Sequence, residues 1–328
     1  MSLQIIKAGL LDTIQDDGRT GYSHLGINPG GVMDAFSYRL ANALLGKNLT
    51  DAVIELHFPA AQIVFTQSTI ICVTGADFMP RLNNITVPIN HPIVVGAGCT
   101  LRFDGMKQGA RAYLSVKNEW LINKWLDSFS TNKIAGVGGW QGRPLQKGDC
   151  IEFANALGEN AIVANKQFKV LPWSTGEKVD NRNEIEFVIG SEWHCLTNES
   201  QIDFQNSWFQ ITQQADRMGY QLSGCKLSLQ QNTDMLSSAV SFGTVQLLPN
   251  GQVIILMADH QTTGGYPRIA HIISAHLPLL AQKNANDVLK FVQTNLETAE
   301  EKIMKQERYL QQLQEACKFR LEEWLHAH

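Results

Sequence analysis

Short apolar segments alternate with turn residues along most of the chain. Segments rich in Val, Ile, Thr and Phe recur between Gly, Asn and Asp residues, which is typical of β-strands joined by turns. Because helical segments are few, the pattern favours β-barrels or sandwiches over an alternating βαβ sheet. We predict strands at residues 62–65, 69–74, 93–95, 100–103, 112–116, 185–189 and 253–258.

Two segments show helical periodicity instead. Residues 34–45 place apolar side chains on one face, with Asp34 in the N-cap position and Gly46 just after the end. A second segment, residues 296–328, is rich in Glu, Gln, Lys and Leu and predicts an amphipathic helix. This helix could lie against its own domain or a partner subunit, or it could pair with a second copy as a coiled coil. Its polar flanking positions favour the first arrangement, against its own domain or a partner. Its apolar residues recur every seven positions, at Leu296, Ile303, Leu310, Cys317 and Trp324.

The strand pattern breaks once, near residues 169–183, and then resumes. We therefore predict two β-domains, at residues 1–168 and 169–295, followed by the helix. Two short echoes in the same order indicate related halves. The first pairs Arg19-Thr20-Gly21-Tyr22 with Arg217-Met218-Gly219-Tyr220, and the second pairs Gly138-Gly139-Trp140 with Gly264-Gly265-Tyr266.

Composition and charge narrow the class of protein. Of the 328 residues, 44% are hydrophobic and 18% charged, which is ordinary for a globular protein. A net charge of −4 without a basic block disfavours binding of nucleic acid. The sequence has no apolar run of about 18 residues and no signal-peptide pattern, so we expect no membrane span. Six scattered cysteines without a C-x-x-C pair indicate reduced thiols and a cytoplasmic location.

A polar loop at residues 259–267 follows the apolar strand at 253–258. Its side chains supply hydrogen-bond donors and acceptors, its two glycines permit close approach of the backbone to a ligand, and its tyrosine offers a flat wall. The alternative is a plain β-turn with the usual polar residues. As a ligand site, the loop would contribute Asp259, Gln261, Thr262, Thr263, Gly264, Gly265 and Tyr266.

A second candidate site precedes the first predicted helix. The N–H groups of Gly30 and Gly31 would lie at the positive end of the helix dipole, which suits a carboxylate, carbonyl or phosphate. Arg19 would add a forked pair of donors. In the structural alternative, Asp34 only caps the helix and Arg19 forms an ion pair with Asp16.

Two further clusters carry candidate chemistry. Four glycines within residues 136–142 indicate a loop held close to a ligand or to another backbone, with Gly138 and Gly139 as candidate ligand contacts. This loop lacks the phosphate-loop pattern. Arg217, between an acidic residue and a Gly-Tyr pair, indicates either an anion clamp or a buried ion pair. The histidine spacing predicts no metal site.

Together these blocks resemble the KipA family, which is also known as allophanate hydrolase subunit 2 and as the C subunit of 5-oxoprolinase. The resemblance covers residues 3–292 and implies two tandem cyclophilin-like β-barrel domains. It also implies kinship with the biotin-dependent carboxyltransferase domain of urea carboxylases. The blocks that carry it are residues 9–19, 29–34, 40–42, 74–77, 138–149, 216–220 and 259–267.

The resemblance implies a component of an ATP-dependent 5-oxoprolinase, which opens the 5-oxoproline lactam to glutamate together with subunits A and B, a KipI-like partner among them. The chain by itself is then expected to be inactive. Arg19 or Arg217 would hold the substrate carboxylate, and the glycine pairs would stabilise an oxyanion. Asp34 or Asp259 would act as general base.

Two alternative functions follow from the same resemblance. One is a biotin-dependent carboxyltransferase acting on urea or a related amide. Biotin would then be carried by another chain, because this sequence lacks a biotinyl Met-Lys-Met. The other is a regulatory binding protein that antagonises a kinase inhibitor.

Overall fold

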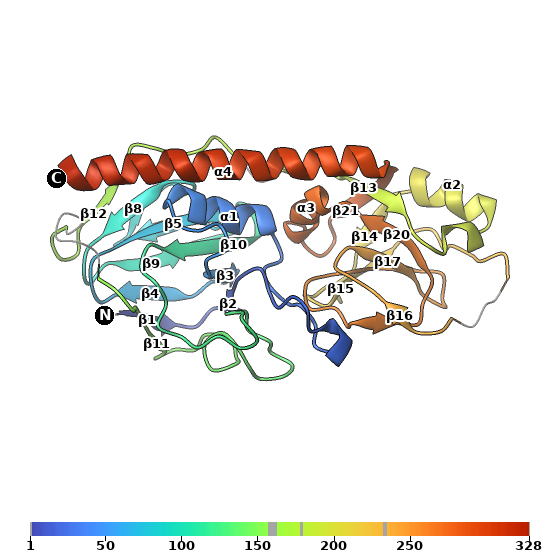
Figure 1. Cartoon of the computed structure of the whole chain (residues 1–328), viewed down its shortest axis with the longest axis horizontal. Coiled ribbons are helices and arrows are strands. Elements are labelled where there is room, and N and C mark those ends of the chain that lie inside the picture. Colours follow the sequence, from blue (N-terminus) through green and yellow to red (C-terminus); the bar gives the residue numbers. More distant parts are fainter. Residues whose placement is uncertain (1, 157–162, 178–179, 232–234, 328) are drawn as a thin grey trace. The chain divides into compact units, whose positions relative to one another are not determined.

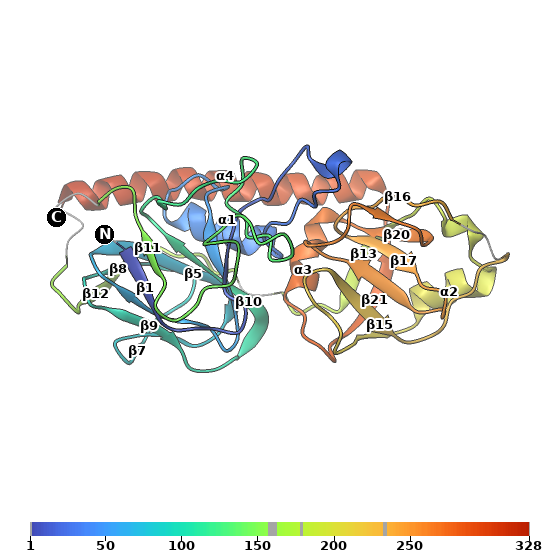
Figure 2. The same cartoon turned by 90° about the horizontal axis from the view of Figure 1, so that it is seen from below.

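The computed structural model describes residues 2–156, 163–177, 180–231 and 235–327 (Figure 1). Contacts divide the chain into two compact units. The first unit consists of Met1–Gly18, Asp34–Val179 and Glu307–His328, and the second of Arg19–Met33 and Asp180–Gln306. Both are built mainly from strands, which confirms the predicted mainly-β class (Figure 2). No helix among the described residues is long and apolar enough to cross a membrane.

The first unit contains two six-stranded sheets in which all neighbours are antiparallel. One sheet has the order β11 (Cys150–Glu152), β1 (Ser2–Lys7), β4 (Gln62–Phe65), β9 (Thr100–Phe103), β6 (Pro80–Leu82) and β7 (Ile85–Thr86). The other has the order β12 (Phe168–Val170), β8 (Pro92–Val95), β5 (Thr69–Asp77), β10 (Gln108–Val116), β3 (Val53–His57) and β2 (Thr13–Gln15).

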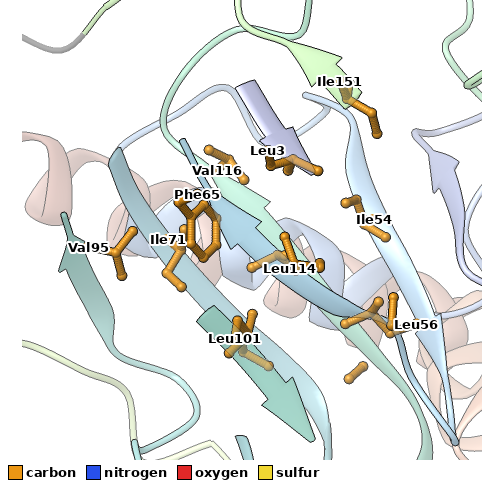
Figure 3. Packing of buried hydrophobic residues seen from close by; sticks show 14 of the residues in the cluster. Leu3, Ile54, Leu56, Phe65, Ile71, Val95, Leu101, Leu114, Val116 and Ile151 are labelled. Atoms are coloured by element: carbon orange, nitrogen blue, oxygen red, sulfur yellow. The ribbon is translucent and has the colours of Figure 1, made fainter. Parts of the chain in front are cut away.

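Strand alternation explains how this unit buries two separate clusters. Ile71 and Val73 of β5 join the main core, to which both sheets contribute side chains. The intervening Ile70 and Cys72 pack instead with the helices α1 (Ala35–Leu44) and α4 (Leu296–Ala327). Because both faces are covered, β5 reads as a continuous apolar run. Figure 3 shows part of the main core, including Leu3, Phe65, Leu101, Leu114 and Ile151.

The second unit is a closed barrel of seven strands. Phe204 of α2 (Asn198–Asn206) stacks on Phe291 inside it, with 4.2 Å between ring centroids. The short α3 spans Leu277–Ala281, and a separate ribbon pairs β16 (Ser238–Ala239) with β19 (Thr263–Gly264). The barrel order is β13 (Glu184–Ile189), β20 (Arg268–Ile272), β17 (Thr244–Leu247), β18 (Val253–Leu256), β15 (Gly219–Ser223), β14 (Phe209–Ile211) and β21 (Val288–Gln293).

The units divide the chain differently from the predicted domains. The division falls at residues 179/180 rather than 168/169, because β12 still pairs with β8 of the first unit. Residues 19–33 belong to the second unit, where Met33 is fully buried in the core. The C-terminal helix is shared, with residues 296–306 in the second unit and 307–328 in the first.

The local predictions hold well. A strand lies at each of the seven predicted places, and α1 begins after Asp34 as its capping pattern predicts. Helix α4 is also confirmed, and its apolar stripe packs on the first unit through Leu310, Cys317 and Leu321. The structure therefore agrees with the favoured alternative, in which the helix covers its own chain.

Truncation of Leu310 to alanine tests this packing. Leu310 is 2% exposed, so its loss should lower the free energy of unfolding by about 2–4 kcal/mol. Phe319 on the same helix is 61% exposed, and Phe319→Ala should change it by less than about 0.5 kcal/mol. Urea unfolding followed by circular dichroism measures both variants. Equal effects would contradict the burial of this stripe.

Candidate functional site

A polar cluster in the second unit unites residues from three of the predicted sites. Arg19, Gly30 and Gly31 come from the segment at residues 19–33. Arg217 lies two residues before β15, and Asp259 lies three residues after the end of β18. The sequence separates these residues by up to 240 positions, and the barrel strands β15 and β18, which pair side by side, bring the last two together.

An ion pair forms the centre of this cluster. Arg217 Nε donates to Asp259 Oδ2 at 2.9 Å, and Nη2 donates to Oδ1 at 3.0 Å. The same Nη2 donates to the carbonyl oxygen of Gly31 at 2.5 Å, and the N–H of Asp259 donates to the carbonyl of Arg217 at 2.7 Å. The side chains of Arg217 and Asp259 are 7% and 18% exposed. This geometry is a bidentate pair that is largely shielded from water.

Gly30 lies between this ion pair and a second arginine. A Cβ atom at Gly30, where φ is 63°, would lie 3.1 Å from Arg19 Nη1 and 3.8 Å from Asp259 Oδ1. Any larger residue would therefore be strained and would crowd the guanidinium. Arg19 is itself 1% exposed, and its N–H donates to the carbonyl of Pro29 at 2.7 Å. The backbone at Gly30 thus adjoins both a cation and a carboxylate.

A tight turn presents Arg217 to the cluster. Asp216 Oδ1 accepts hydrogen bonds from the N–H groups of Met218 and Gly219 at 2.7 and 3.2 Å. A Cβ atom at Gly219 would lie 2.9 Å from Ile254 Cδ1, so the Ile254 side chain would have to shift to accommodate a larger residue there. Of the two sequence alternatives for Arg217, the structure shows the ion pair.

His260 adjoins the cluster and was not among the predicted site residues. It is 2% exposed, and its Nδ1 lies 2.6 Å from the carbonyl oxygen of Gln261. Because a carbonyl only accepts, Nδ1 carries the proton. Burial lowers the pKa of His260, against smaller raising effects of the Gln261 carbonyl and the charge of Asp259. In the sequence, only its position directly after Asp259 indicated that it could belong to the site.

The rest of the 259–267 loop leads away from the ion pair. The carbonyl of Thr262 accepts from the N–H of Val240 at 3.2 Å, and Thr263 and Gly264 form β19. Gly265 and Tyr266 line a separate hollow of about 750 Å³, with Tyr266 44% exposed. Gln261 is exposed.

Three predicted residues lie in the first unit instead. Asp34 caps α1, accepting from Ser37 N at 2.8 Å and from Ser37 Oγ at 2.6 Å. Both its carboxylate oxygens therefore serve the first turn of the helix. Gly138 and Gly139 line a different pocket, of about 590 Å³.

In place of the Asp16–Arg19 pair of the structural alternative, Asp16 makes other contacts. Asp16 accepts from Ser128 Oγ, Ser130 Oγ and Phe129 N, each at 2.6 Å. It therefore anchors the segment that leads into the glycine-rich loop. Within the described ranges, no group of three His, Cys, Asp or Glu side chains is placed to hold a metal ion.

The sequence is similar to a known protein family and to two proteins with curated names. A family model described as carboxyltransferase domain, subdomain A and B, matches residues 25–293. A Haemophilus influenzae protein, named as the C subunit of 5-oxoprolinase, is 36% identical over 92% of this chain and 94% of its own length. An Escherichia coli protein of the same name is 34% identical over 95% of this chain and 97% of its own length.

Among solved structures, the urea amidolyase of K. lactis matches with a TM-score of 0.86 at 23% sequence identity. The match covers 95% of this chain but only 20% of that protein. This likeness shows a shared fold.

Removal of one partner tests how well the Arg217–Asp259 pair is shielded from water. Arg217→Met leaves the shielded carboxylate without its guanidinium, and we expect it to lower the free energy of unfolding by about 3 kcal/mol. The exposed pair Arg182–Asp180 is the control, since Arg182→Met should cost less than about 1 kcal/mol. Denaturant unfolding of the purified chain compares the two variants. Equal losses would mean that the central pair is no better shielded than a surface pair.

Proposed function

Because the chain belongs to the family of carboxyltransferase domains with subdomains A and B, we propose that it is the C subunit of an ATP-dependent 5-oxoprolinase. The observation that carries the proposal is the match to two proteins of that name over more than nine-tenths of their length. In this function the complex opens the 5-oxoproline lactam to glutamate. The chain works with subunits A and B and forms no glutamate by itself.

The polar cluster of the second unit supplies groups that suit this reaction. Amide resonance makes a lactam carbonyl a poor electrophile, so the reaction needs donors for the oxyanion that develops. The N–H groups of Gly30 and Gly31 are suited to this role, and the buried guanidinium of Arg19 next to Gly30 adds positive charge beside them. Arg217 holds Asp259 in place rather than binding the substrate.

Asp259 has the second role in this proposal. Its two oxygens accept one hydrogen bond each from Arg217 and keep further lone pairs. These lone pairs allow it to orient the attacking water as a general base. Asp34 is less suited, because it caps α1 and is only 1% exposed, whereas the side chain of Asp259 is 18% exposed. ATP is consumed by the complex.

Reconstitution tests the function and the role of Asp259 separately. The purified chain is mixed with subunits A and B, ATP and 5-oxoproline, and glutamate is measured with each component omitted in turn. Asp259→Asn should lower kcat by about 10²–10⁴-fold, because the amide cannot accept a proton from water. The matched control Asp180→Asn removes an exposed carboxylate of the same unit and should retain full activity.

Each outcome has a distinct meaning. Full activity of Asp259→Asn would remove the role of this residue and leave the function standing. No glutamate from the complete wild-type mixture would overturn the function. The family match also supports an alternative, a carboxyltransferase component acting on urea or a related amide with biotin on another chain. Urea-dependent turnover with a biotinylated carrier would favour that alternative.

A further inference from the structure

A pocket of about 590 Å³ lies in the first unit and is formed by two stretches of chain, residues 121–125 and the glycine-rich loop at 136–142. This volume falls in the range of small-molecule sites, about 300–1,000 Å³. The pocket shares no residue with the polar cluster of the second unit. The pocket is therefore distinct from the site proposed for hydrolysis.

The glycine-rich loop that lines the pocket is flanked on both sides by hydrogen-bonded anchors. At its start, the N–H of Thr131 donates to the carbonyl of Ile14 at 2.9 Å, next to the hydrogen bonds that Asp16 accepts from residues 128–130. At its end, Arg143 and Asp149 form a bidentate pair with both distances 2.8 Å. The pocket is thus built before any ligand arrives.

Close packing with neighbouring protein atoms explains two glycines of this loop. A Cβ atom at Gly139 would lie 1.9 Å from Thr131 Oγ1, and one at Gly142 would lie 1.9 Å from the carbonyl oxygen of Gly136. These two glycines are required by neighbouring protein atoms. Gly138 has a positive φ of 71° and lines the pocket.

Two tryptophans supply flat walls. Trp125 and Trp140 both line the pocket, and Trp140 also packs against the main core of the unit. A side chain supported from behind by a core keeps a fixed face toward a ligand. Such a face suits stacking of a flat aromatic ring.

The polar groups of the pocket favour an anion. Lys124 lines it, with Nζ held 4.9 Å from the centroid of the Phe129 ring, and no acidic residue is among the described lining residues. In the part of the chain that the structure describes, the N–H groups of Gly138, Trp140 and Gln141 donate to no protein acceptor. Left-handed turns with such N–H groups form concavities that bind anions. One ammonium and three amides suit a group with several acceptor oxygens.

We propose that this pocket binds a nucleoside phosphate, with the base against Trp125 or Trp140 and the phosphate on Lys124 and the loop N–H groups. The tryptophan rings suit the flat base of such a ligand, and the cation and amide donors suit its phosphate. The volume fits a nucleotide better than a small lactam acid. This chain alone binds the nucleotide, whether or not it is part of a 5-oxoprolinase.

Titration of the full chain, without other subunits, tests the proposal through tryptophan fluorescence. ATP should quench the fluorescence saturably. Adenosine lacks the phosphate and tripolyphosphate lacks the ring, so each should bind at least about tenfold more weakly, a loss of about 1.4 kcal/mol. Tripolyphosphate that binds as tightly as ATP would reduce the pocket to a simple anion site. An absence of saturable quenching up to millimolar ATP would also overturn the proposal.

Variants place the binding in this pocket. Lys124→Gln should weaken ATP about tenfold and leave adenosine unchanged, because only the phosphate contact is lost. Trp140→Leu should weaken both ligands, measured by calorimetry so that the lost fluorophore does not matter. The control Lys305→Gln removes an exposed cation from α4 and should leave ATP binding unchanged. Equal weakening by Lys124→Gln and Lys305→Gln would show non-specific attraction and contradict the proposal.

Discussion

The polar cluster of the second unit depends on the fork of a single guanidinium. Arg217 uses it to hold both oxygens of Asp259 and the carbonyl of Gly31, so three distant stretches of chain meet at one planar group. Burying such a charge is unfavourable unless its donors are matched by acceptors in the same plane. A lysine would offer a point charge without the two parallel bonds. The arrangement of Gly30 and Arg19 beside the carboxylate follows from this constraint.

Local features of the fold were predictable because local physics decides them. The strands follow from short β-branched runs between turn residues, and α1 begins where Asp34 can cap it. Pairing between distant strands has no such local signal. The sequence therefore indicated barrels or sandwiches, while only the structure shows two sheets in the first unit and a closed barrel in the second. Residues 19–33 belong to the second unit, and their lack of strand periodicity left no signal of it.

The sequence predicted several residues of the candidate site, but it did not predict which of them lie together. Arg19, Gly30, Arg217 and Asp259 were all proposed from their residue types and meet in the structure. Tyr266 was proposed with Asp259 but lines a separate hollow, because β19 carries the chain away. The glycines show the same limit. Gly30 accommodates a neighbouring guanidinium, whereas Gly139 accommodates Thr131 and Gly142 the backbone of Gly136. The sequence alone does not distinguish these reasons.

The interleaving of the two units along the chain has a consequence for synthesis on the ribosome. Residues 19–33 emerge early but belong with a barrel whose strand β18 begins at residue 253. The first unit in turn lacks its last segment until residues 307–328 are made. Neither unit can therefore complete its fold before most of the polypeptide has been translated. No single cut of the gene would yield either unit intact.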